Sequence, residues 1–245
     1  MWSSIYKDRV VYEDDNVLGI NKPEGISVVS DRNDEDIVSL AKSENVHIIP
    51  VHRIDKETSG LLVLAKDQAT HSFITRQFTK RLVTKTYLTI VRQGDMPKEG
   101  TIDLPLSIGR KHKVRIAAKK ENITFDRGQN VWFVKDADIF TDKRNYPSKT
   151  QIKNIYQDEN YMLLSVHPLT GRTHQIRVHL AWIGFPILGD PLFEKNNSFP
   201  RTYLHSYSLT FVHPNTEKEI TLKALPTKEF FTPLKNFSSE RLIEV

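Results

Sequence analysis

The feature that most constrains the fold of this chain is an uninterrupted apolar run, Leu61 to Ala65, that directly follows a polar stretch. The whole segment, VHRIDKETSGLLVLAK, covers residues 51 to 66. A continuous apolar run of this length, bounded by turn residues, is typical of a buried strand. A plain turn before such a strand needs only Ser59 and Gly60. The four residues His-Arg-Ile-Asp ahead of the turn therefore need another explanation.

Most of the remaining chain has the pattern of short strands and hairpins. Apolar runs flanking turn residues predict hairpins near the N-terminus, from about residue 9 to residue 23, and over residues 203 to 224. Further strands are predicted over residues 84–93, 113–118, 130–135 and 160–168, and helices over 33–42, 67–81, 173–184 and 227–237. Because strands outnumber helices, we expect an α+β fold with a largely antiparallel mixed sheet and flanking helices. The polar segment 119–148 has no pattern that places it.

The composition favours an anionic partner. The 245 residues include 35 Lys and Arg against 30 Asp and Glu, a net charge of +5. The chain has no cysteine, which excludes disulfides, thiolate nucleophiles and zinc sites built on cysteine. No apolar run approaches the length that crosses a bilayer, so we expect no membrane association and a cytoplasmic protein.

Asp55 is the first candidate for chemistry, because it lies between Arg53 and a turn, just before the buried strand. An arginine beside a carboxylate stabilises its ionised form. A nucleophile or a general base requires such an ionised group. The structural alternative is a turn aspartate that accepts hydrogen bonds from the backbone N–H groups of Thr58 or Ser59.

A second group of candidates lies in the predicted helix that starts at Thr173. With Thr173 as its cap, this helix would bury a stripe formed by Ile176, Leu180 and Ile183 and would stop at Gly184.

On the same helix, His174 and Arg177 share another face, so that Arg177 can lie along the rim of a cleft. Arg172 falls at the helix N-terminus, where backbone donors favour anions. The alternative is a solvated basic face. His174 and His179 are five positions apart, off the spacing that places two metal ligands on one helical face, and we expect no metal site.

Tyr87 is the third candidate. In an alternating strand Tyr87 and Thr89 point to one side, and Leu88 and Ile90 to the other. The ring of Tyr87 can then face the same cleft as Asp55 and stack on a planar base. A lone aromatic in a strand is more often part of the core.

Six blocks of sequence carry a resemblance to a known family. They are NKPEG (21 to 25), HRIDKETSGLLVLAK (52 to 66), VTKTYLTIV (83 to 91), LTGRTHQIRVHL (169 to 180), GFPILGD (184 to 190) and LHSYSLTFVHP (204 to 214). In this order they closely resemble the motifs of the RluA-type pseudouridine synthases, over nearly the whole chain apart from the polar segment near 119 to 148.

The resemblance implies an RNA enzyme that converts uridine in rRNA or tRNA to pseudouridine without a cofactor. It implies that Asp55 is the essential aspartate, that Arg177 pairs with it and that Tyr87 stacks on the target base. It also implies that Arg53 enters the RNA stack where the target base has left, and it assigns no role to His52.

The other expected RNA contacts are basic. Phosphate contacts are expected from Lys85, Arg172 and the cluster RKHKVR, residues 110 to 115. His52 and His174 complete the set of substrate-binding candidates.

We further expect one catalytic domain over residues 1–245 with the pseudouridine synthase fold and a central RNA-binding cleft, and a monomer. There is no room for an S4 domain before NKPEG. A non-catalytic RNA-binding protein of the same fold is the alternative, but it predicts the loss of Asp55, Tyr87 or Arg177, and all three are present. A hydrolase that forms an aspartyl phosphate would place its aspartate directly after the apolar strand, whereas here the strand follows Asp55.

Overall fold

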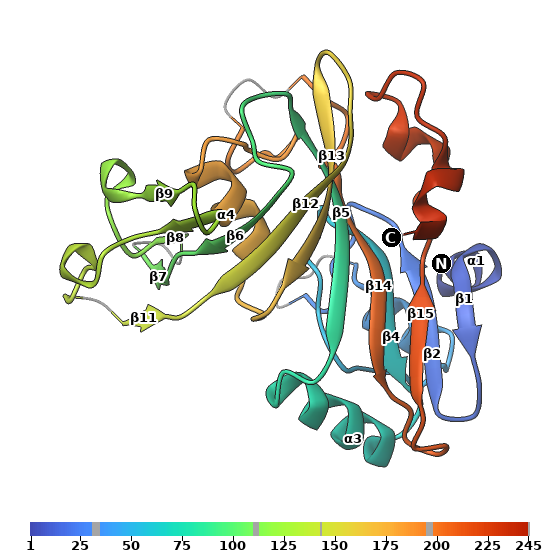
Figure 1. The fold of residues 1–245 in the computed structure, drawn as a ribbon. Helices are drawn as coiled ribbons and strands as arrows, with labels where there is room; N and C mark the ends of the chain where they lie inside the picture. Colours follow the sequence, from blue (N-terminus) through green and yellow to red (C-terminus); the bar gives the residue numbers. More distant parts are fainter. Residues whose placement is uncertain (31–34, 110–112, 143, 195–197, 245) are drawn as a thin grey trace. The chain divides into compact units, whose positions relative to one another are not determined.

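A computed structural model of the protein describes residues 1–30, 35–109, 113–142, 144–194 and 198–244 (Figure 1). The chain divides into two compact units. The first combines Met1–Tyr87 with Leu204–Thr227, and the second combines Leu88–Tyr203 with Lys228–Val245. The single domain expected over residues 1–245 stays a prediction. Among the described residues, no helix is both long and apolar enough to span a bilayer.

The first unit is built on a mixed sheet with helices packed against it. Its elements are α1 (Trp2–Arg9), β1 (Val10–Glu13), β2 (Val17–Lys22), α2 (Ile37–Ser43), β3 (Ile49–Pro50), β4 (Ser59–Ala65), α3 (Gln68–Thr79), the first part of β5 (Thr84–Arg92), β14 (Leu204–Val212) and β15 (Glu219–Lys223). The strands follow the order β1-β2-β4-β14, with β15 beside β14 (Figure 1). Strand β3 pairs with β4. The β4–β14 pair is parallel, and the others named here are antiparallel.

Strand β4 is the centre of this unit, since every one of its residues is buried. Val63 packs into a core that includes Ile74 of α3. Leu62 and Leu64 pack into a different core that includes Trp2 of α1. Burial of one large aliphatic side chain contributes about 1.5–3 kcal/mol. The predicted buried strand is confirmed, and its sequence is continuously apolar because both of its faces are covered.

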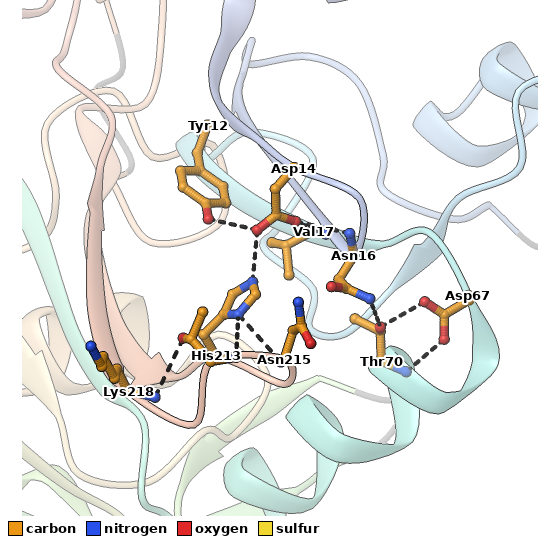
Figure 2. A network of polar contacts seen from close by, with 10 residues as sticks. Tyr12, Asp14, Asn16, Val17, Asp67, Thr70, His213, Asn215 and Lys218 are labelled. Atoms are coloured by element: carbon orange, nitrogen blue, oxygen red, sulfur yellow. Dashed lines mark hydrogen bonds and ion pairs between the residues drawn. The ribbon is translucent and has the colours of Figure 1, made fainter.

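A polar network joins the two hairpins of the first unit (Figure 2). The carboxylate of Asp14 accepts a hydrogen bond from the Tyr12 hydroxyl at 2.7 Å and lies 2.7 Å from Nε2 of His213. It also accepts the backbone N–H groups of Asn16 and Val17, which closes the β1–β2 turn. Burial opposes ionisation, but these hydrogen bonds outweigh it and lower the pKa of Asp14. Both predicted hairpins are confirmed.

The second unit carries the remaining strands and one α-helix among its described residues. Its elements are the rest of β5, β6 (Glu99–Asp103), β7 (Leu106–Ile108), β8 (Val114–Ile116), η2 (Lys120–Asn122), β9 (Thr124–Asp126), β10 (Val131–Phe133), η3 (Asp136–Asp138), β11 (Asn145–Tyr146), β12 (Lys149–Gln157), β13 (Tyr161–Pro168), α4 (Gln175–Trp182), η4 (Lys228–Phe231) and η5 (Ser239–Glu244). Strands β13-β12-β6-β10-β9 are neighbours in this order in the large sheet, and a separate sheet has the order β11-β7-β8.

Two differences from the predicted elements lie towards the C-terminus and in the polar segment of this unit. The helix predicted over 227–237 is only the short 3-10 helix η4, because Pro233 has no backbone N–H to continue a helix. The polar segment 119–148 contains η2, β9, β10, η3 and β11. Strand β10 confirms the strand predicted over 130–135, whereas the other elements are each two or three residues long, too short for a periodic pattern to reveal them.

Candidate active site

The loop between β3 and β4 carries three of the predicted site residues. Arg53 is exposed, whereas His52 and Asp55 are half-buried. The backbone N–H of Thr58 donates to the carbonyl of Asp55 at 3.0 Å, so the loop turns directly after the aspartate. This loop, residues 51 to 58, is called the Asp55 loop below.

The NKPEG segment is hydrogen-bonded to the Asp55 loop through a buried lysine. Lys22 is 0% exposed, and its ammonium donates to the carbonyls of Pro23 at 2.7 Å, Ile26 at 2.8 Å and Lys56 at 3.4 Å. The backbone N–H of Gly25 donates to the same Lys56 carbonyl at 2.8 Å. A buried ammonium needs such acceptors, because an unsatisfied buried charge is strongly unfavourable. The peptide that follows the candidate nucleophile is therefore held by β2 and its turn.

His52 anchors the start of the Asp55 loop to β4. Its Nε2 accepts the backbone N–H of Val63 at 3.0 Å, and its ring stacks on Phe78 with centroids 5.1 Å apart. Burial, helped by the nearby charge of Lys85, lowers the pKa of His52 to about 3. The imidazole is therefore neutral at pH 7, with its proton on Nδ1.

The end of the Asp55 loop is fixed against β14. The Ser59 hydroxyl lies 2.8 Å from Nδ1 of His205, whose Nε2 lies 2.9 Å from the carbonyl of Ala224. Because a carbonyl only accepts, Nε2 carries the proton and Nδ1 accepts from Ser59. Gly60 has φ +108°, and a Cβ there would lie 2.3 Å from the carbonyl oxygen of Ser206. The motif therefore needs glycine at position 60, because β4 and β14 approach each other too closely there for a side chain.

Tyr87 belongs to the same unit as Asp55 and lies close to it. Its half-buried ring packs against the core that contains Ile54. Burial raises the pKa of Tyr87 to about 12; the Ser206 hydroxyl acts against this shift, and the charge of Asp55 adds to it. The phenol is therefore protonated at neutral pH, and Tyr87 is near enough to Asp55 for that charge to raise its pKa.

Lys85 is half-buried two residues before Tyr87 on β5. Burial, with a smaller contribution from the charge of Arg81, lowers the pKa of Lys85 to about 8. Most of its population is still cationic at pH 7, and His52 responds to that charge.

Helix α4 of the second unit carries Arg177, which is buried and not at a rim. Its Nε donates to Oδ2 of Asp190 at 2.7 Å and its Nη2 to Oδ1 at 2.8 Å, with both side chains at most 1% exposed. The guanidinium also lies 5.9 Å from the ring centre of Phe193. Two parallel hydrogen bonds fix the arginine in one orientation. The pairing of Arg177 with Asp55 stays a prediction.

The start of α4 differs from the prediction by one residue. The N-cap is His174, with φ 52° and no side-chain capping bond, and not Thr173. The turn is held from inside, because Oε1 of Gln175 accepts from the Thr170 hydroxyl at 2.6 Å and from the backbone N–H of Arg172 at 3.1 Å. Arg172 and His174 are both half-buried beside this turn.

His179 is used inside the second unit. Its Nδ1 lies 2.9 Å from the Thr150 hydroxyl and its Nε2 lies 3.0 Å from the carbonyl of Leu104. Burial lowers the pKa of His179 to about 4, although Leu104 and the charge of Asp103 act against this shift. Within the described part of the chain, no three His, Asp or Glu side chains are grouped so as to hold a metal ion.

Sequence reasoning gave no role to three residues that shape these regions, Lys22, Asp190 and His205. Each lies inside a motif block. The signal that could have revealed each of them is a charged or polar residue within or next to an apolar run. The basic cluster 110–115 is only partly covered, since residues 110–112 lie outside the described residues.

Comparison with known proteins adds independent findings. The sequence profile of the RNA pseudouridylate synthase family matches residues 16–182. A dual-specificity RNA pseudouridine synthase RluA of Escherichia coli O157:H7 is 31% identical over 222 residues, covering 88% of this chain and 91% of that protein. An uncharacterized RNA pseudouridine synthase of Haemophilus influenzae is 36% identical over 226 residues, covering 91% and 89%. The solved structure of human RNA pseudouridylate synthase domain containing 4 aligns with a TM-score of 0.74 and 25% identity, covering 99% and 95%.

Proposed function

Because the chain belongs to the RNA pseudouridylate synthase family and is an RNA pseudouridine synthase, we propose that it isomerises specific uridines of rRNA or tRNA with Asp55 as the catalytic carboxylate. The observation that carries this proposal is the fixed position of the Asp55 loop. Lys22, His52 and Ser59 hold the loop at three places, and Tyr87 lies close to the carboxylate. Such preorganisation is what a nucleophile or base in a closed site requires.

The reaction adds no atoms overall. The N1–C1′ bond of the uridine breaks, the bound uracil rotates, C5 joins C1′, the proton on C5 is released to solvent, and N1 takes up a proton from solvent. Asp55 starts this sequence by attack on C1′, by attack on C6, or by removal of the C2′ proton. Tyr87, protonated at neutral pH, supplies the ring on which the uracil stacks.

The uracil must leave the RNA stack before Asp55 reaches it. Arg53 is exposed on the same loop, and its planar guanidinium fits the space that the base vacates. The pairing of Arg177 with the Asp55 carboxylate is part of this proposal. The bidentate bond of Arg177 to Asp190 fixes the direction of the guanidinium.

Basic groups hold the RNA backbone. We assign phosphate contacts to Lys85 and Arg172 and further substrate contacts to His52 and His174. The enzyme acts without a cofactor, as a monomer, in the cytoplasm. The printed name of the Escherichia coli relative, a dual-specificity RNA pseudouridine synthase, is the reason to test rRNA and tRNA together.

The test is a map of pseudouridine across total RNA from cells with and without the gene. We expect one or more sites in rRNA or tRNA to disappear with the gene, to return with the wild-type gene, and to stay absent with the Asp55→Asn gene. An unchanged map, or full restoration by Asp55→Asn, would contradict the proposal.

A further inference from the structure

Two arginines of the second unit share the ring of one tyrosine. The guanidinium carbon of Arg144 lies 5.1 Å from the ring centre of Tyr146, and that of Arg172 lies 5.5 Å from the same centre. Tyr146 lies on β11 of the small sheet β11-β7-β8, whereas Arg172 precedes α4. Arg172 is further held by its Nε, 3.5 Å from the carbonyl of Pro147. The two arginines, together with the ring of Tyr146 that they share, are called the arginine pair below.

The arginine pair concentrates positive charge. Across the described residues, neither Arg144 nor Arg172 has a carboxylate within ion-pair distance. Lys149, at the start of β12, is neutralised, because its ammonium lies 2.7 Å from Asp103. Two like charges held against one ring repel each other, and an anion that binds both relieves the repulsion.

The geometry also limits what kind of anion fits. Guanidinium groups bind phosphate with two parallel hydrogen bonds. Arg144 is exposed, and Arg172 and Tyr146 are half-buried, so the cationic ends are open while the ring fixes their spacing. A polyanion with phosphates repeated along a chain meets both cations at once.

We propose that the arginine pair is a phosphate-binding surface for the backbone of the RNA substrate. This inference rests on the proposed function for the identity of the polyanion, and it assigns a role to Arg144 and Tyr146, for which the sequence gave none. Tyr146 acts by holding both guanidinium groups in place. Because Arg144 and Tyr146 belong to the segment outside the family motifs, they add RNA contacts to that of Arg172, which lies in a motif.

The test measures how RNA affinity depends on salt. The probes are a polyuridine oligonucleotide and unfractionated tRNA, with affinity measured by fluorescence anisotropy over a series of NaCl concentrations. Each lost phosphate contact flattens the slope of log affinity against log salt by about 0.7 for single strands and about 0.9 for duplexes. Arg144→Gln and Arg172→Gln should each cause such a decrease, and the double variant about twice as much.

A matched control and a ring variant complete the design. Arg127 is an exposed arginine of the same unit that already lies 3.6 Å from Asp95, so Arg127→Gln should leave the slope unchanged. Tyr146→Leu keeps both guanidinium charges but removes the ring that fixes their positions. RNA affinity should therefore fall, while the slope of log affinity against log salt should flatten less than in the double variant.

Unchanged slopes in folded Arg144→Gln and Arg172→Gln proteins, or an equal change in Arg127→Gln, would overturn the inference. Tritium release from C5-labelled uridine by the wild type separates this result from the proposed function. An active wild type whose variants keep their slopes refutes only the surface. An inactive wild type whose variants lose slope as expected refutes only the isomerisation.

Discussion

The Asp55 loop and the start of α4 both hold proposed site residues, but through different buried contacts. In the loop, the ammonium of Lys22 donates to backbone carbonyls and the neutral ring of His52 accepts a backbone N–H. At α4, Arg177 and Asp190 form two hydrogen bonds between opposite charges. Removing a donor to carbonyls leaves neutral acceptors, whereas removing half of an ion pair leaves a buried charge. Substitution at α4 should therefore be the more damaging.

The largest expected effect is that of Arg177→Met. It leaves the carboxylate of Asp190, 0% exposed, without this charge partner, so the free energy of unfolding should fall by about 3–5 kcal/mol. Chemical denaturation measures this loss.

The control removes both charges. Arg177→Met combined with Asp190→Leu should recover much of the loss, because no buried charge remains. Recovery should stop short of the wild type, since Asp190 also accepts the backbone N–H of Leu192 at 2.8 Å. Strictly additive losses would show that the two side chains are not coupled, and the contrast between the regions would fail.

The second prediction concerns pH. His179 has a pKa of about 4 in the folded protein, below its ordinary 6.5. The unfolded chain binds this proton as the pH falls below about 6.5, so the stability is fully present above that pH and is lost on acidification toward 4. The difference between the two pKa values corresponds to about 3 kcal/mol.

The measurement compares the free energy of unfolding of the wild type and His179→Gln between pH 7 and pH 4. The variant should be less stable at pH 7 and should lose less stability on acidification. His52, whose pKa is also lowered, contributes to the slope of both proteins. Identical slopes would show that His179 is not the group that senses pH.

The smallest predicted loss of stability is at Lys22. Lys22→Met removes the donor to three carbonyls and should cost about 1–3 kcal/mol. It should also lower kcat, because the Asp55 loop loses one of its anchors. Lys66→Met is the matched control, since Lys66 is partly exposed and paired with Glu13, where a pair contributes less than about 1 kcal/mol. Equal losses of unfolding free energy in Lys22→Met and Lys66→Met would show that Lys22 does not anchor the Asp55 loop.

How far the fold could be predicted depended on how clear an apolar pattern surrounds each element. Strand β4 and both hairpins of the first unit were predictable, because their apolar patterns run over several residues. Helix α1 was missed, since Trp2 is its one buried residue. Strand β12 was missed although it has nine residues, because most of its side chains are polar. Strands β7 and β11 were also missed, at three and two residues.

The site shows a related limit. Asp55, Tyr87 and Arg177 stood out because each lies in a recognisable motif. Their supports did not, because the contacts join residues far apart in the chain: Ser59 and its partner His205 are 146 positions apart. The local sequence shows which donor or acceptor groups a residue carries, whereas only the folded structure shows which distant residue pairs with them.

The central claim is that the carboxylate of Asp55 performs the chemistry, and its most direct test is tritium release from C5-labelled uridine in a substrate RNA under single-turnover conditions. Asp55→Asn keeps the shape but not the nucleophile or base, so the rate should fall by more than about a thousandfold, some 4 kcal/mol in barrier, with folding intact. Asp95→Asn, an exposed aspartate of the second unit, should react at the wild-type rate. An Asp55→Asn rate within about tenfold of wild type, which corresponds to a barrier only about 1.4 kcal/mol higher, would contradict the account.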